Sequence, residues 1–187
     1  MICVVFAVAA VETFIYELGE EAFRLGEWKP DVDQNIVGLG ELIRDLEEAK
    51  YQLVLKALWV ERYLTGKRPD RGSALFQDFD LLVRLRNTII HLKDTEEHLF
   101  YDDGSVQTKG TPKVVSQLAS RKLIPSPYQP SWIVAVSTIK IAAWSCQTAA
   151  QMMMAIVHML PHSDFRDKIA MLCDPLRKAP WIAKLLA

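Results

Sequence analysis

Three side chains that could do chemistry lie within six residues of one apolar segment of the sequence. Arg86, Asn87 and His91 occur in FQDFDLLVRLRNTIIHLK, which spans residues 76–93. An imidazole changes its charge near neutral pH and can move a proton. A guanidinium stays charged and presents a fork of hydrogen-bond donors to an anion. The segment therefore holds one residue type for proton transfer and one for anion binding.

Helical spacing divides this segment into two faces. At about 100° per residue, a broad apolar face contains Phe79, Leu82, Val83, Ile89 and Ile90. Such a face predicts a helix packed inside a bundle. Arg86 projects from the middle of the apolar face, whereas a separate polar stripe contains Asp80, Arg84, Asn87 and His91.

An arginine on an apolar face needs a partner, because burying an unpaired guanidinium is very costly. Arg86 must meet a carboxylate, reach a cleft or face another subunit. Glu47 and Glu48 are candidate acids, although solvation is the simpler role for such a charged run. Two interpretations follow for the pair of motif residues. Arg86 makes a structural ion pair while His91 caps the last helical turn, or both residues belong to a functional site.

The segment and its surroundings resemble the HEPN superfamily, the all-helical domains of many RNase toxins and defence proteins. The family signature is Arg-x(4–6)-His with a polar residue after the arginine. Residues 86–91 read Arg-Asn-Thr-Ile-Ile-His, and a helical segment that contains LEEAKYQLVLKAL precedes them. The resemblance extends over most of the chain. The position two residues after His91 is Lys93, where one branch of the family has a modified tyrosine.

The resemblance implies an antiparallel helical bundle and a homodimer in which two motif helices meet in one composite cleft. It implies metal-independent cleavage of RNA that leaves 2′,3′-cyclic phosphate ends. His91 would act as base or acid, Arg86 would clamp the phosphate, and Asn87 would orient one of them. An antitoxin or other regulatory protein would be a further partner. A non-catalytic helical module for dimerisation, or for binding RNA or protein, is the alternative function.

Composition limits how the chain could contact RNA. The net charge of the 187 residues is −1, so no global positive field attracts nucleic acid. RNA contacts must be local, with Arg84 and Lys93 as candidate substrate-binding residues beside Arg86. No metal-ligand spacing or phosphate-binding glycine loop is present, so we expect neither metal nor cofactor.

The three cysteines predict a reducing compartment. They are widely spaced and odd in number, which fits a cytoplasmic protein without disulfides. Cys3 and Cys146 lie in apolar helical sequence and are expected to be small core residues. Two apolar runs, residues 2–11 and 132–160, are the candidate membrane spans. The first continues into polar helical sequence and polar residues interrupt the second, so we expect no membrane span.

The remaining pattern predicts one all-α domain over residues 1–187. The first helix covers about residues 2–24 and ends at Gly26, and a second carries apolar residues from Leu39 to Leu58. Residues 66–72 form a loop by composition. Residues 94–112 form an insert, in which Asp103-Gly104 predicts the turn of a β-hairpin.

The last third of the chain is also expected to be helical. Thr111 should cap a short helix that stops near Arg121. A long helix should run from Ser131 to about Leu160, and a C-terminal appendage should cover residues 163–187 with a short helix over 165–173. The methionines at 152–154 suit either close core packing or a small-molecule site, and core packing is the simpler interpretation.

Overall fold

The computed structural model describes residues 1–29, 33–91, 97–100, 106–109, 111–126 and 131–178. Only the backbone is described for residues 97–100, 106–109 and 174–178. The helices are α1 (Ile2–Trp28), α2 (Gln34–Glu48), α3 (Leu53–Thr65), α4 (Ala74–Ile90), α5 (Lys113–Ser120), α6 (Trp132–Val136), α7 (Ile139–Met159) and α8 (Asp164–Lys178). The predicted all-α class is confirmed for the described residues that form the core.

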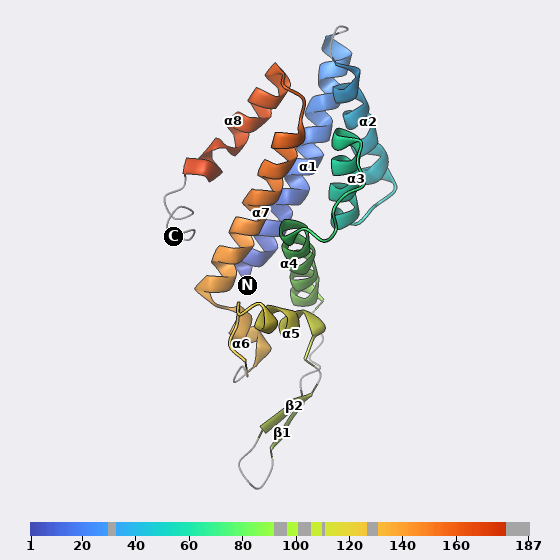
Figure 1. Cartoon of the computed structure of the whole chain (residues 1–187). Coiled ribbons are helices and arrows are strands. Elements are labelled where there is room, and N and C mark those ends of the chain that lie inside the picture. The colour runs from blue at the N-terminus through green and yellow to red at the C-terminus, as the bar shows by residue number, and fades with distance from the viewer. Residues whose placement is uncertain (30–32, 92–96, 101–105, 110, 127–130, 179–187) are drawn as a thin grey trace.

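Two long helices form the centre of the bundle. α1 and α7 run side by side in the same direction, with α2 and α3 on one side and α8 on the other (Figure 1). α4 packs against both central helices. Their shared core contains the fully buried side chains Val8, Ile15, Leu39, Phe79, Leu82, Ile141 and Ile156. Burial of these aliphatic and aromatic groups is the main force that holds the helices together.

Glycines let α1 and α2 approach closely. A Cβ added at Gly40 would lie 2.6 Å from the backbone nitrogen of Phe23, and one at Gly19 would lie 2.5 Å from the Ile43 side chain. The predicted end of the first helix at Gly26 is wrong, because α1 continues to Trp28. Gly26 instead packs against Val37 of α2, where a Cβ would come within 2.9 Å of a methyl group.

The second predicted helix is interrupted in the structure. α2 ends at Glu48 and α3 begins at Leu53. Lys50 has a φ of 53°, and the Tyr51 N–H donates to the Leu46 carbonyl at 3.0 Å. This is the left-handed helix end that glycine usually provides. A lysine at this position gives no sequence signal for the break.

The insert after α4 contains two paired strands. β1 (Glu97–Phe100) and β2 (Val106–Lys109) are antiparallel, and Phe100 pairs with Val106. They extend beyond one end of the bundle (Figure 1). The predicted turn at Asp103-Gly104 lies outside the described residues. α5 follows with Pro112 as its N-cap, one residue later than predicted, and its C-cap is Arg121.

The long helix predicted from Ser131 to Leu160 is two helices. α6 ends at Val136, and α7 starts after Thr138, whose hydroxyl accepts a hydrogen bond from the Ile141 N–H at 3.3 Å. The Ser137 hydroxyl donates to the Ile133 carbonyl at 2.6 Å. These local hydrogen bonds compete with the helical ones and mark the break.

The described residues contain one helix, α1, that is long and apolar enough to cross a membrane. Of its most apolar window, 39% is buried inside the bundle. Its outer face is itself apolar near the start, where Ile2 and Phe6 are exposed. The expected burial of Cys3 is wrong, because this thiol is exposed on the same helix, while Cys146 is half-buried on α7.

Candidate functional site

α4 is a buried helix whose two ends are set by polar residues. The Ser73 hydroxyl caps its start and accepts a hydrogen bond from the Phe76 N–H at 3.3 Å. At the other end, the His91 N–H donates to the Asn87 carbonyl at 2.9 Å, so His91 is the C-cap. α4 therefore ends at Ile90, and Lys93 lies outside the described residues.

The predicted apolar face of α4 is buried over most of its length. Phe79, Leu82 and Val83 lie in the core, and Ile89 is half-buried. Ile90 departs from the prediction, since half of its surface is exposed. The apolar face thus opens to the surface at the end of α4 that carries His91.

Arg86 finds a carboxylate within the chain. One of its terminal nitrogens donates to Glu12 Oε2 on α1 at 3.3 Å. The Arg86 side chain is 23% exposed and that of Glu12 is 48% exposed. Arg86 thus lies at the border of the core, where it can pair with an acid and still reach solvent.

The sequence pointed to the wrong acid for this pairing. Glu47 instead accepts from Lys56 Nζ at 2.5 Å, and this lysine is buried on α3. The signal for Glu12 was nevertheless present, since it is the first charged residue of the chain and follows eleven residues without charge. An isolated acid on an apolar helix is a natural partner for an isolated arginine on another.

The polar stripe of α4 faces solvent and the short helix α5. Arg84 pairs with Asp80 one turn before it at 2.8 Å and donates to Gln117 Oε1 of α5 at 2.8 Å. Asn87 and His91 are exposed farther along the same stripe. Arg84 is therefore already engaged, while the Asn87 and His91 side chains face the surface.

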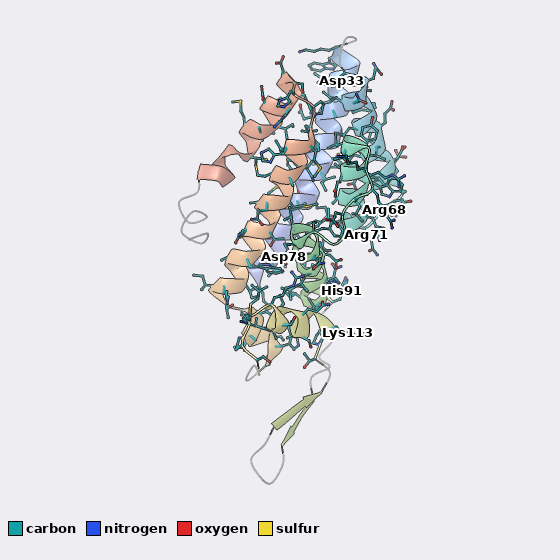
Figure 2. The ribbon with its side chains drawn as sticks, in the orientation of Figure 1. Asp33, Arg68, Arg71, Asp78, His91 and Lys113 are labelled. Carbon is teal, nitrogen blue, oxygen red and sulfur yellow. The ribbon has the colours of Figure 1, made fainter. Side chains whose placement is uncertain are left out.

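α5 adds basic residues beside this stripe. Lys113 and Gln117 of α5 and its C-cap Arg121 follow one another at four-residue spacing. Arg121 forms an ion pair with Asp78 of α4. Lys113 lies at the end of α5 nearest to His91 (Figure 2). The predicted site residues Arg84, Asn87 and His91 thus share one exposed edge with Lys113.

Arg86 points away from that edge. Five residues of helix separate Arg86 from His91, which corresponds to a rotation of about 140°. Glu12 of α1 holds Arg86 on one side of α4, and α5 lies on the other. One copy of the chain therefore does not bring the guanidinium and the imidazole together.

Comparisons with known proteins identify no relative: no family model, curated protein or solved structure matches this chain. Within the described residues, no group of three or more histidine, cysteine or acidic side chains could hold a metal ion. The assignment of a function therefore depends on the motif residues and on their placement along α4.

Proposed function

We propose that this protein is a metal-independent endoribonuclease of the HEPN type, with a toxin or defence role in the cytoplasm. The observation that carries the proposal is the placement of the motif. Asn87 and His91 are exposed at the end of a helix that is otherwise packed in an all-α bundle. Arg86 lies on the same helix at the border of the core.

The chemistry needs three functions around one phosphodiester bond. A base removes the proton of the ribose 2′-hydroxyl, a donor stabilises the charged phosphorane, and an acid protonates the leaving 5′-oxygen. His91 serves as base or acid, because its imidazole can hold or release a proton near neutral pH. Arg86 donates to the phosphorane oxygens, and Asn87 orients His91 or the phosphate. The product carries a 2′,3′-cyclic phosphate.

The active unit is a homodimer. Arg86 and His91 point in different directions on one α4, whereas two copies related by a two-fold axis can place residues of both in one cleft. Ile90 at the end of α4 and Phe6 near the start of α1 are apolar and exposed, and both lie toward the same end of the bundle (Figure 1). They supply apolar surface for such a contact. An antitoxin or other regulatory protein would control access to the cleft.

The direct test is incubation of the pure protein with structured and unstructured RNA in the presence of EDTA. The wild type should cleave, and His91→Ala should lose about 10²–10⁴-fold in rate, the usual contribution of a general acid or base. Arg86→Lys should not restore what Arg86→Ala loses, because lysine lacks the forked donor geometry. Product ends should be 2′,3′-cyclic phosphates by mass spectrometry.

Two results would contradict the proposal. One is a wild-type protein that leaves every RNA intact, and the other is cleavage that survives His91→Ala. Lys113→Ala serves as the matched control, because it removes a neighbouring cation without touching the motif. It should weaken RNA binding modestly and leave the pH dependence of the rate unchanged.

The Arg86–Glu12 ion pair favours a second candidate function. An arginine that already has a carboxylate partner can be purely structural. The protein would then be a non-catalytic HEPN-like helical module that dimerises or binds RNA or protein. Such a module would bind its partner equally well after His91→Ala and would produce no cyclic phosphate ends.

A further inference from the structure

A second surface, outside the motif, combines exposed aromatic rings with unpaired cations. It comprises the end of α3 and the loop that follows, and we call it the α3–α4 corner: Trp59, Arg62, Tyr63, Lys67, Arg68 and Arg71. We infer that this corner binds single-stranded RNA, with bases stacked on Trp59 and phosphates held by the cations. The inference deepens the proposed RNase function, on which its choice of RNA as ligand rests.

The aromatic component is an exposed tryptophan. Trp59 is 41% exposed and Tyr63 38% exposed, although both belong to a helix that packs in the bundle. The Arg62 guanidinium lies 5.5 Å from the centroid of the Trp59 ring, close enough for a cation–π contact. A stacked base and an adjacent phosphate are the groups that such an indole–guanidinium pair recognises in single strands.

Of the two aromatic rings, Tyr63 is less suited than Trp59 to stack on a base. A Cβ added at Gly38 of α2 would lie 2.2 Å from the Tyr63 hydroxyl, so the polar end of the ring faces α2. Burial raises the pKa of Tyr63, and the charges of Glu41 and Asp33 raise it further. Because these acids lie on the α2 side, a phosphate backbone would pass on the Arg62 side of α3.

The cations of the corner are available for phosphates. Within the part of the chain that the structure describes, Arg62, Lys67, Arg68 and Arg71 form no ion pair. Elsewhere in the described residues, Arg24, Arg44, Lys56, Arg84, Arg86, Arg121 and Lys168 each have a carboxylate partner, whereas Lys29, Lys50, Lys113, Lys122, Lys140 and Arg166 do not. The corner is distinguished by four cations without an ion pair within residues 62–71, in a chain whose net charge is −1.

The two acids of this segment do not neutralise the corner directly. Asp70 accepts a hydrogen bond from the Gly72 N–H at 2.8 Å and forms no ion pair with Arg68 or Arg71. Glu61 lies about 160° around α3 from Trp59 by helical arithmetic. With four cations against these two acids, residues 59–72 carry a formal net charge of +2.

The loop holds its cations in an ordered backbone. Gly66 ends α3 with a φ of 65°, and its N–H donates to the Arg62 carbonyl at 2.9 Å. The Lys67 N–H donates to the Thr65 hydroxyl at 3.2 Å, and Ser73 then caps α4. Because these hydrogen bonds already order the loop, the entropic cost of fixing it in a complex with RNA is smaller.

The corner and the motif lie at opposite ends of α4. Arg68 and Arg71 precede the start of that helix, and His91 follows its end (Figure 2). A helix of 17 residues is about 25 Å long. A single strand that spans this length would contact the corner with one part and the motif with another, so the corner acts as an anchor upstream or downstream of the cleaved bond.

The test uses a 12-nucleotide 2′-O-methyl RNA labelled with fluorescein, because a 2′-O-methyl strand lacks the hydroxyl needed for cleavage. Binding is followed by fluorescence anisotropy over a range of salt concentrations. The double variant Arg68→Ala/Arg71→Ala should bind several-fold more weakly at low salt. The association constant K of the wild type should fall with rising salt. In the double variant, the slope of log K against log salt should be less steep by about 1.4, that is, by about 0.7 for each lost phosphate contact.

A second variant separates stacking from charge. Trp59→Ala should weaken binding about tenfold while leaving the salt slope unchanged, because stacking involves no counterion release. Trp59→Phe should recover part of the affinity, since it restores an aromatic face. The control is Arg24→Ala/Lys168→Ala, which removes two exposed cations outside the corner. Arg24 lies near the C-terminal end of α1, and Lys168 lies on α8. It should bind like the wild type.

The outcomes distinguish this inference from the proposed function. If the corner variants bind as tightly as the control pair, or the wild type does not bind the strand, the inference is wrong, whatever the result of the cleavage assay. If binding depends on Trp59, Arg68 and Arg71 but no RNA is ever cleaved, the inference that the corner binds RNA is supported and the RNase proposal is wrong.

Discussion

At the scale of single residues, the central question is what Arg86 does with its charge. The sequence showed that it needs a partner, and the structure supplies Glu12. Both side chains keep contact with solvent, so their attraction is screened and they can separate at small cost. The pair is therefore compatible with an arginine that leaves Glu12 when a phosphate binds.

The first prediction concerns the stability of Arg86→Ala. A partly exposed ion pair typically contributes about 0–1 kcal/mol, so the variant should unfold within about 4 °C of the wild type, as expected for a chain of this size. Differential scanning calorimetry of Arg86→Ala and Glu12→Gln would measure the change. A drop of 10 °C or more in Arg86→Ala would show that Arg86 is needed for the fold and would support the structural interpretation.

The second prediction concerns the reactivity of two cysteines. Burial raises the pKa of the Cys146 thiol, and a nearby Cys3 thiolate raises it further. A raised pKa means less thiolate at a given pH, and the thiolate is the reactive form. Iodoacetamide at pH 8 should therefore modify the exposed Cys3 before Cys146, and the Cys146 rate should keep rising at higher pH. Peptide mass spectrometry that found Cys146 modified first would contradict this assignment.

At the scale of elements, the close contact between α1 and α2 depends on glycine. Alanine normally stabilises a helix by about 1 kcal/mol relative to glycine. At Gly40, however, the added Cβ would meet the backbone of Phe23 and the Gly19 carbonyl, neither of which can rotate away. The two helices would have to move apart and lose contacts in the core.

The third prediction is that Gly40→Ala destabilises the protein by about 1–3 kcal/mol, the usual cost of overpacking. Urea unfolding followed by circular dichroism would give the value. Gly66→Ala is the comparison, because nothing lies within 4 Å of its Cβ position and its cost comes only from the left-handed backbone. A gain in stability for Gly40→Ala would mean that α1 and α2 are not so closely packed.

The sequence predicted the elements better than their ends. Hydrophobic spacing located α1, α4 and α7, because each has one continuous buried face. It missed the break at Lys50, where a residue without special backbone preference adopts the left-handed conformation. It also missed the break at Ser137, because apolar residues lie on both sides of it.

The geometry of the candidate site was predictable in part for a related reason. The helix that carries Arg86 and Asn87, and the faces on which they and His91 lie, follow from local spacing. The identity of the Arg86 partner depends on a contact between residues 74 positions apart, which no local pattern contains. The end of α4 before Lys93 was equally unmarked, since Leu92 and Lys93 are both good helix formers.

At the scale of the whole molecule, one chain leaves apolar surface exposed where the proposed cleft would form. Ile2 and Phe6 at the start of α1 and Ile90 at the end of α4 are at least half-exposed, and exposed apolar surface can mark an interface. A second copy of the chain would cover this surface and bring a second α4 to the first.

The fourth prediction is the mass of the protein in solution. Light scattering at micromolar concentration should give about 42 kDa, twice the 21.2 kDa of the chain. Phe6→Glu should shift the mass toward that of one chain, because a buried unpaired carboxylate opposes association. A mass near 21 kDa at every concentration would leave the motif residues without a composite cleft.

The measurement that tests the central claim most directly mixes two inactive variants. Arg86→Ala and His91→Ala should each fail to cleave RNA. If Arg86 of one copy acts with His91 of the other, the cleft of a wild-type dimer holds two such pairs, and a mixed dimer retains one intact pair. After subunit exchange, half of the dimers are mixed, so the mixture should recover about a quarter of the wild-type rate. A mixture as inactive as its components, beside an active wild type, would contradict a site shared between two copies.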